Sequence, residues 1–140
     1  MRRPPKISES EWEVMKVLWE RSPRTANEIV ESLLKTTPWK RETIRTLINR
    51  LVRKKAVGFQ KEGRQYHYSP RVAEAECIKE ETRSLLRRFG GTPIEPMLAA
   101  FVEEQRLSPE QIERLKRILA GEDAGEAGHG AKQGRVSERK

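Results

Sequence analysis

The sequence is poor in the residues that build metal, redox and catalytic sites. Its 140 residues include one cysteine, Cys77, and two histidines, His67 and His129, so neither an intramolecular disulfide nor a usual zinc site is expected. The sole aspartate, Asp123, lies in a polar C-terminal stretch, and no glycine-rich phosphate loop occurs. We therefore expect no metal, no cofactor and no enzymatic activity.

Large apolar side chains are also scarce, since hydrophobic residues make up 35% and aromatic residues 6% of the chain. No apolar run is long enough to span a bilayer, and the N-terminus lacks the apolar segment of a signal peptide. These absences predict a soluble, cytoplasmic protein. A core this small also predicts a homodimer, because a second copy buries further apolar surface.

Positive charge is concentrated in one half of the chain. Residues 1–70 contain 16 Lys and Arg against 8 acidic residues, whereas residues 71–119 carry 9 of each sign and residues 120–140 carry 4 of each sign. The formal net charge of +8 therefore arises from the first half. This concentration predicts a polyanionic partner, either nucleic acid or an anionic membrane surface.

Three amphipathic segments follow one another in the basic half. Ser8 and Glu11 have the spacing of a capping box at the start of a predicted helix. Thr25 and Glu28 repeat that spacing for a second, shorter helix. Apolar residues at helical spacing predict a third helix over Lys40–Lys55. Two helices and a tight turn before a basic helix form the order that a major-groove reader needs.

The outward face of the third helix carries donors to phosphates and base edges. We expect Arg45, Thr46 and Asn49 to face bases, while the other basic residues of this helix, through Lys55, mostly contact phosphates. Asn27 is expected to contact a phosphate at the start of the second helix. The predicted DNA-binding residues are Asn27, Arg41, Thr43, Arg45, Thr46, Asn49, Arg50, Arg53, Lys54, Lys61 and Arg64.

Alternating polarity over residues 57–61 and 64–69 predicts a small β-hairpin, with a turn at Glu62-Gly63. Its place directly after the basic helix makes it the wing of a winged helix, with Lys61 and Arg64 at the tip. We expect Tyr66 and Tyr68 to pack against the three helices. Trp12 and Trp19 share the apolar stripe of the first helix and are expected in the core.

The second half predicts three more helices, over residues 72–89, over residues 93–104 and from Ser108, where a cap precedes Pro109. Helices this short do not close a core alone, so we interpret them as half of a dimer interface. The predicted interface residues are Ile78, Leu85, Leu86, Phe89, Met97, Leu98, Phe101, Val102, Ile112, Leu115 and Ile118.

The predicted fold class is thus mainly α with a small β-hairpin wing. We expect a winged helix-turn-helix DNA-binding domain over residues 1–70 and a helical dimerisation domain over residues 71–119. Residues 120–140, rich in glycine, alanine and charge, are expected to form a disordered tail.

The segments ISESEWEVMKVLWE, TANEIVESL, TIRTLINRLVRKKAVGF and MLAAFVEEQRLSPEQIERLKRIL, with YHYSP in the wing, resemble the penicillinase repressor family of bacteria. The likeness covers roughly Ile7 to Leu119. It implies a homodimeric repressor on a two-fold symmetric operator in double-stranded DNA, with a role in a β-lactam or cell-envelope response. In the family a membrane-bound sensor metalloprotease cuts the repressor, and the matching bond here is Ala100-Phe101.

Two other functions fit the same residues. The winged helix can serve as an adaptor that binds another protein, which a gel shift with DNA would distinguish. Alternatively, a small-molecule effector bound between the C-terminal helices can relieve repression, and ligand-dependent melting without proteolysis would reveal it.

Overall fold

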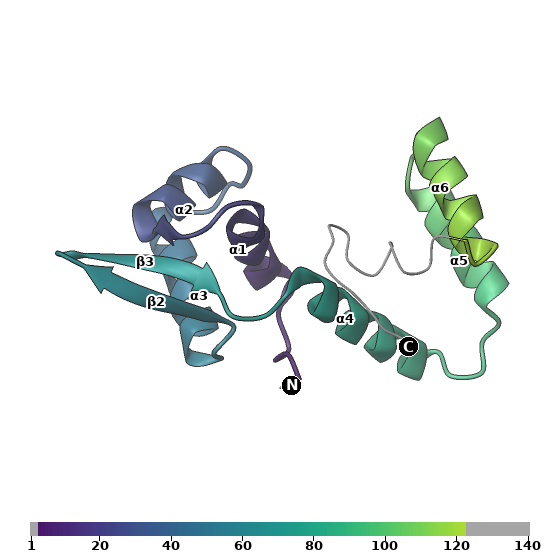
Figure 1. Cartoon of the computed structure of the whole chain (residues 1–140), viewed down its shortest axis with the longest axis horizontal. Coiled ribbons are helices and arrows are strands. Elements are labelled where there is room, and N and C mark those ends of the chain that lie inside the picture. Colours follow the sequence, from purple (N-terminus) through teal and green to yellow (C-terminus); the bar gives the residue numbers. More distant parts are fainter. Residues whose placement is uncertain (1–2, 123–140) are drawn as a thin grey trace. The chain divides into compact units, whose positions relative to one another are not determined.

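The structure is a computed structural model that describes residues 3–122 and divides the chain into two compact units, Met1–Glu80 and Glu81–Lys140. The elements of the first unit are α1 (Glu9–Glu20), β1 (Arg24–Thr25), α2 (Ala26–Leu34), α3 (Arg41–Arg53), β2 (Val57–Glu62) and β3 (Gln65–Pro70) (Figure 1). Helix α4 (Glu74–Arg88) begins in this unit, and α5 (Ile94–Glu104) and α6 (Pro109–Leu119) belong to the second. The predicted fold class, a mainly helical winged helix, is confirmed.

Side-chain caps fix where α1 and α2 begin. The Ser8 hydroxyl accepts from the Glu11 backbone N–H, and the Glu11 carboxylate accepts from the Ser8 N–H. Thr25 and Glu28 make the same reciprocal pair at α2. Each box satisfies backbone donors that a first helical turn leaves without intrahelical partners. Both predicted capping boxes are therefore confirmed.

The apolar faces of α1, α2 and α3 meet in one core. Its most deeply buried side chains are Val14, Met15, Leu18, Ile29, Val30, Ile44, Ile48 and Leu51. Trp12 and Trp19 are half-buried against this core, with ring centroids 5.4 Å apart in an edge-on arrangement. The Trp19 indole N–H donates to the Val72 carbonyl at 2.9 Å. The predicted core packing of the two tryptophans is thus confirmed.

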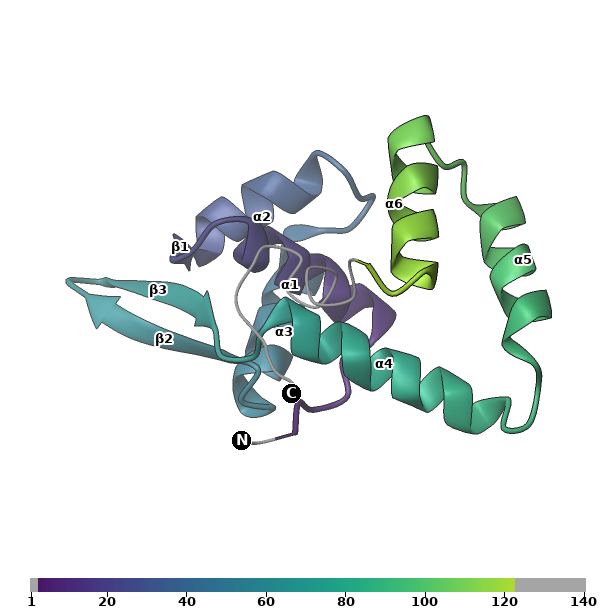
Figure 2. The same cartoon turned by 45° about the vertical axis from the view of Figure 1, so that its right-hand side comes forward.

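Strand β3 is the centre of a three-stranded antiparallel sheet of order β1-β3-β2. Glu62 pairs with Gln65, so Gly63 and Arg64 form the turn, one residue later than predicted. Gly63 has φ 64°, a left-handed value that favours glycine. In Figures 1 and 2 the β2–β3 hairpin extends away from the three helices as a wing.

Strand β1, which the sequence did not predict, ties the start of α2 to the wing. Arg24 pairs with Tyr68 and Thr25 with His67. Figure 2 shows β1 directly before α2. Tyr68 joins the core as predicted, at 9% exposure. The prediction for Tyr66 is wrong, because this side chain is 44% exposed farther out on the hairpin.

The second unit presents apolar side chains to solvent. Ser108 and Gln111 form a capping box, and Pro109 occupies the first turn of α6 as predicted. Neither α5 nor α6 contains a buried residue. The predicted tail over residues 120–140 lies, from residue 123 on, outside the described residues.

Candidate nucleic-acid interface

Helix α3 has one buried face and one exposed face. Ile44, Leu47, Ile48 and Leu51 are at most 4% exposed and hold the helix in the core. The opposite face carries the exposed residues Arg41, Thr43, Arg45, Thr46, Asn49, Arg50 and Arg53. An α-helix with side chains is about 10 to 12 Å wide, which matches the major groove of B-DNA. This face therefore offers guanidinium, hydroxyl and amide groups in a form that fits the groove.

Two arginines of α3 are joined to α2. Arg45 Nη2 donates to Asn27 Oδ1 at 3.0 Å, and Arg41 Nη2 forms an ion pair with Glu31. All four residues are exposed, so these contacts lie on the same surface as the predicted base-reading residues. The sequence predicted Asn27 and both arginines as DNA contacts but not their contacts with one another.

Lys54 directs its ammonium toward its own chain. Its Nζ atom lies 2.5 Å from Glu11 Oε1 and donates to the Lys6 carbonyl at 2.8 Å. Burial raises the pKa of Glu11, but hydrogen bonds from Lys54 and Ser8 outweigh it and hold this pKa below 4.5. The predicted phosphate contact of Lys54 would require this ion pair to open.

The basic end of α3 finishes in a left-handed residue. The Lys55 N–H donates to Val52 O and the Ala56 N–H to Leu51 O, the two hydrogen bonds of a Schellman motif. Lys55 has φ 68°, a backbone conformation that usually selects glycine. A cation thus occupies a strained position at the end of the exposed face.

The wing adds cations and aromatic rings to the same unit. Lys61 is exposed in β2 and Arg64 is exposed in the turn. The rings of Phe59 and Tyr66 meet edge-on with centroids 4.8 Å apart, and Lys61 Nζ lies 6.0 Å from the Tyr66 ring. These contacts place a cation beside an aromatic pair on the hairpin.

The Tyr68 hydroxyl is affected by the charge of Arg45 on α3. Burial raises the pKa of this hydroxyl, the Tyr66 charge acts in the same direction, and the positive charge of Arg45 opposes both. Arg45, which contacts Asn27 at the start of α2, thus also acts electrostatically on Tyr68 in β3. Among the predicted site residues, the structure brings Asn27 of α2 and Arg45 of α3 into direct contact.

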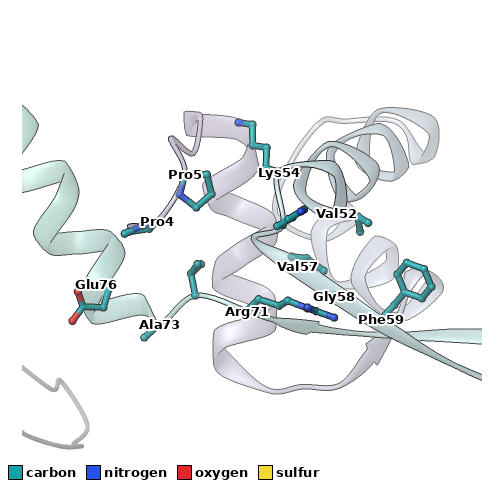
Figure 3. A pocket seen from close by; sticks show the side chains of 12 residues that line it. Pro4, Pro5, Val52, Lys54, Val57, Gly58, Phe59, Arg71, Ala73 and Glu76 are labelled. Atoms are coloured by element: carbon teal, nitrogen blue, oxygen red, sulfur yellow. The ribbon is translucent and has the colours of Figure 1, made fainter. Parts of the chain in front are cut away.

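An open groove of about 940 Å³ runs along the first residues of β2 (Figure 3). Its lining is Pro4, Pro5, Val52, Lys54, Lys55, Val57, Gly58, Phe59, Arg71, Val72, Ala73 and Glu76. Arg71 extends alongside β2, and a Cβ atom at Gly58 would lie 2.0 Å from its Nε. Glycine at this position therefore leaves room for the guanidinium inside the groove.

The predicted dimer residues lie in α4, α5 and α6, except Phe89, which directly follows α4. Exposed fractions reach 49% for Ile78, 52% for Phe101 and 44% for Val102, and Leu85, Met97, Leu98, Leu115 and Ile118 are half-buried. Leu86, Phe89 and Ile112 are also exposed. Ala100, the residue before the candidate cleavage bond, is exposed within α5.

Two further properties concern only residues 3–122. Within this range, no group of three or more His, Cys, Asp or Glu side chains is arranged so that it could hold a metal ion. None of the helices in it combines the length and the apolar character that crossing a bilayer requires.

Residues 7–121 match the family described as penicillinase repressor. The chain is 40% identical over 119 residues to the penicillinase repressor of Bacillus licheniformis, covering 85% of this chain and 93% of that relative. It is 32% identical over 113 residues to the methicillin resistance regulatory protein MecI of Staphylococcus aureus strain N315, covering 81% and 92%. The solved structure of hsRosR-S4 shares the fold at TM-score 0.50 and 15% identity, over 87% of this chain and 94% of that one.

Proposed function

The chain belongs to the penicillinase repressor family, and from this premise we propose that it is a sequence-specific DNA-binding repressor of transcription and not an enzyme. The observation that carries the proposal is the exposed polar face of α3, beside α2 and the wing in one compact unit. The names of its relatives, a penicillinase repressor and a methicillin resistance regulatory protein, support it. DNA as the binding partner would place the chain in the cytoplasm.

In this proposal the α3 face enters the major groove. Arg45, Thr46 and Asn49 contact base edges, where an arginine pairs best with guanine and an asparagine with adenine. The phosphate contacts come from Arg41, Arg50, Arg53, Lys55, Lys61 and Arg64. We assign Lys54 to the support of α1 instead, because its ammonium already has two acceptors.

The proposal is tested with a duplex that the chain selects from a random-sequence library. Its dissociation constant is measured at several salt concentrations, and affinity should fall steeply with salt because each phosphate contact releases counterions. Arg45→Ala should lose about 1 to 3 kcal/mol of binding to the selected duplex. Arg114→Ala, which removes an exposed arginine of α6, is the matched control and should bind normally. Affinity that stays flat with salt would contradict the proposal and favour the protein adaptor.

We also propose a homodimer joined through the second half of the chain, with residues 1–70 reading DNA and residues 71–119 dimerising. The support is the row of exposed apolar side chains in α5 and α6, neither of which buries a residue in the single chain. Two linked DNA-reading units bind a two-fold symmetric operator far more tightly than one unit does.

We further propose that cleavage at Ala100-Phe101 relieves repression, and the structure of α5 offers physical support for this proposal. Proteases bind extended segments, so α5 must unwind before it is cut. Its N-cap, Pro93, makes no side-chain cap hydrogen bond, and the helix has no buried side chain to hold it closed. Mass spectrometry of the chain from cells treated with a β-lactam should detect a fragment that ends at Ala100, the product of a membrane sensor metalloprotease.

A small-molecule effector is a second candidate for the release signal, and the groove that favours it lies along β2, not between the C-terminal helices where the sequence led us to expect it. The volume of about 940 Å³ is within the usual range for ligand pockets, and Arg71 would attract a carboxylate. Small molecules extracted from the producing cells would then raise the melting temperature of the native chain but not of Arg71→Ala. This candidate would be contradicted if the extract changed the melting temperature of neither protein.

A further inference from the structure

We propose that Asn27 is a positioning residue, which holds the Arg45 guanidinium in the orientation that reads a guanine, rather than a phosphate contact in its own right. The inference rests on the proposed function, because it concerns how the α3 face reads DNA. The ligand that Arg45 would recognise is a guanine-containing base step, read in the major groove of DNA.

The contact between these residues is specific in geometry. Arg45 Nη2 and Asn27 Oδ1 lie 3.0 Å apart, although the residues are 18 positions apart in the chain. Arginine can only donate hydrogen bonds, so the amide oxygen, not the amide nitrogen, must face it. The orientation of the Asn27 side chain is therefore fixed by chemistry.

Asn27 is mounted on a well-anchored part of the fold. It is the second residue of α2 and lies between Thr25 and Glu28, the two members of the capping box. Thr25 also pairs with His67 in the central strand of the wing. The backbone around Asn27 is therefore held by both α2 and the sheet. A side chain on such a support can restrict the orientation of the flexible Arg45 side chain, and an arginine has about 2 kcal/mol of rotamer entropy to lose.

The donor count leaves Arg45 free to read a base. A guanidinium has five N–H donors, and a bidentate contact to guanine O6 and N7 uses two of them. The bond to Asn27 uses one donor, and the amide oxygen is uncharged, so it does not neutralise Arg45. Fixing Arg45 before binding lowers the entropy that the specific complex must lose.

Arg41 provides the contrast within the same surface. Its partner, Glu31, is a carboxylate, which pairs with the arginine but repels a DNA phosphate. Arg41 must exchange Glu31 for a phosphate when DNA binds, whereas Arg45 can keep Asn27. Removal of the two partners should therefore have opposite effects on affinity.

The test compares the native chain with Asn27→Ala, Arg45→Ala and the double variant. Each is titrated with the duplex selected by the native chain and with a scrambled duplex of the same length, at several salt concentrations. Asn27→Ala should weaken binding to the selected duplex about fivefold, the equivalent of about 1 kcal/mol. Binding to the scrambled duplex and the salt slope should not change. Adding Asn27→Ala to Arg45→Ala should have no further effect, because the two residues act as one unit.

Glu31→Gln is the matched control on the same helix. It should strengthen binding to both duplexes, since Arg41 no longer has a competing carboxylate. The inference is overturned if Asn27→Ala weakens both duplexes equally and lowers the salt slope, which would make Asn27 a phosphate contact. It is equally overturned if Asn27→Ala strengthens binding, or if its effect adds to that of Arg45→Ala. Failure of the native chain to bind any duplex would instead refute the proposed function.

Discussion

The ammonium of Lys54, at the end of α3, lies 2.5 Å from a carboxylate oxygen of Glu11, in the first turn of α1. Glu11 is 2% exposed and also completes the Ser8 capping box, so one carboxylate joins the start of one helix to the end of another. A buried carboxylate without its cation is strongly destabilising, because its desolvation is no longer compensated.

The replacement Lys54→Met should therefore destabilise the folded chain by about 2 to 4 kcal/mol while it leaves the salt slope of DNA binding unchanged. Urea unfolding measures the first effect and a salt titration of DNA affinity the second. Arg53→Met, one residue earlier and exposed, is the control, with the opposite pattern: little loss of stability and a salt slope smaller by about 0.9. A reduced slope for Lys54→Met would return that lysine to the DNA contacts.

Stability should fall in acid in a way that depends on Glu11. Its pKa is lowered in the folded chain, since the bonds from Lys54 and Ser8 outweigh the effect of burial. A lowered folded-state pKa contributes stability at a pH above the ordinary pKa of a glutamate, about 4.3, and this contribution is lost as the pH falls through the folded-state pKa. Glu11→Gln should be less stable at neutral pH and lose less stability on acidification. Parallel curves of unfolding free energy against pH for the two proteins would refute this role.

The substitution Lys55→Gly separates two effects of a lysine in the left-handed backbone conformation, one on stability and one on DNA binding. Glycine adopts φ 68° without a Cβ penalty, so the variant should gain up to about 1 kcal/mol of stability. The same change removes a cation from the end of the α3 face and should weaken binding to all duplexes alike. Thermal unfolding and DNA titration of Lys55→Gly, beside the exposed control Lys40→Gly, measure both effects. A loss of stability would show that the strain at Lys55 is compensated by contacts of its side chain.

Phe101→Asp tests the proposed dimer surface. Phe101 is 52% exposed in the single chain, so the substitution should leave the fold of one chain intact but place a charge in the interface. Sedimentation should show a monomer, and affinity for a two-fold symmetric duplex should fall well below that for the native dimer. Glu104→Gln, at the end of the same helix, should stay dimeric. A Phe101→Asp dimer with native affinity would rule this surface out.

The elements with a repeating pattern were predicted correctly, and so was the core packing of Trp12, Trp19 and Tyr68, but the polar contacts between elements were not predicted. Capping boxes and apolar stripes are local signals, so α1 to α3 and the hairpin follow from spacing alone. Strand β1 has two residues and shows no periodicity, and only its register with Tyr68 and His67 makes it a strand. Tyr66 and Tyr68 share a face, but the hairpin extends past the core, so only the inner tyrosine is covered.

The site shows the same division. The basic face of α3 was evident from its sequence, yet Arg53, Lys54 and Lys55 look alike as neighbouring cations. Their different surroundings depend on where α1 lies, which no local pattern encodes. The same holds for Asn27 and Arg45, whose contact depends on the crossing of α2 and α3.

The short strand β1 also divides the wing into a part with two neighbouring strands and a part with one. It pairs with β3 only at His67 and Tyr68, so the root of the hairpin is held on both sides. From Tyr66 outward, β3 has β2 as its single neighbour in the sheet. The outer part can therefore bend about the His67 pair while the root stays in place. A hinge of this kind would let Lys61 and Arg64 follow a DNA backbone whose groove width varies along the sequence, without moving the helix that reads the bases.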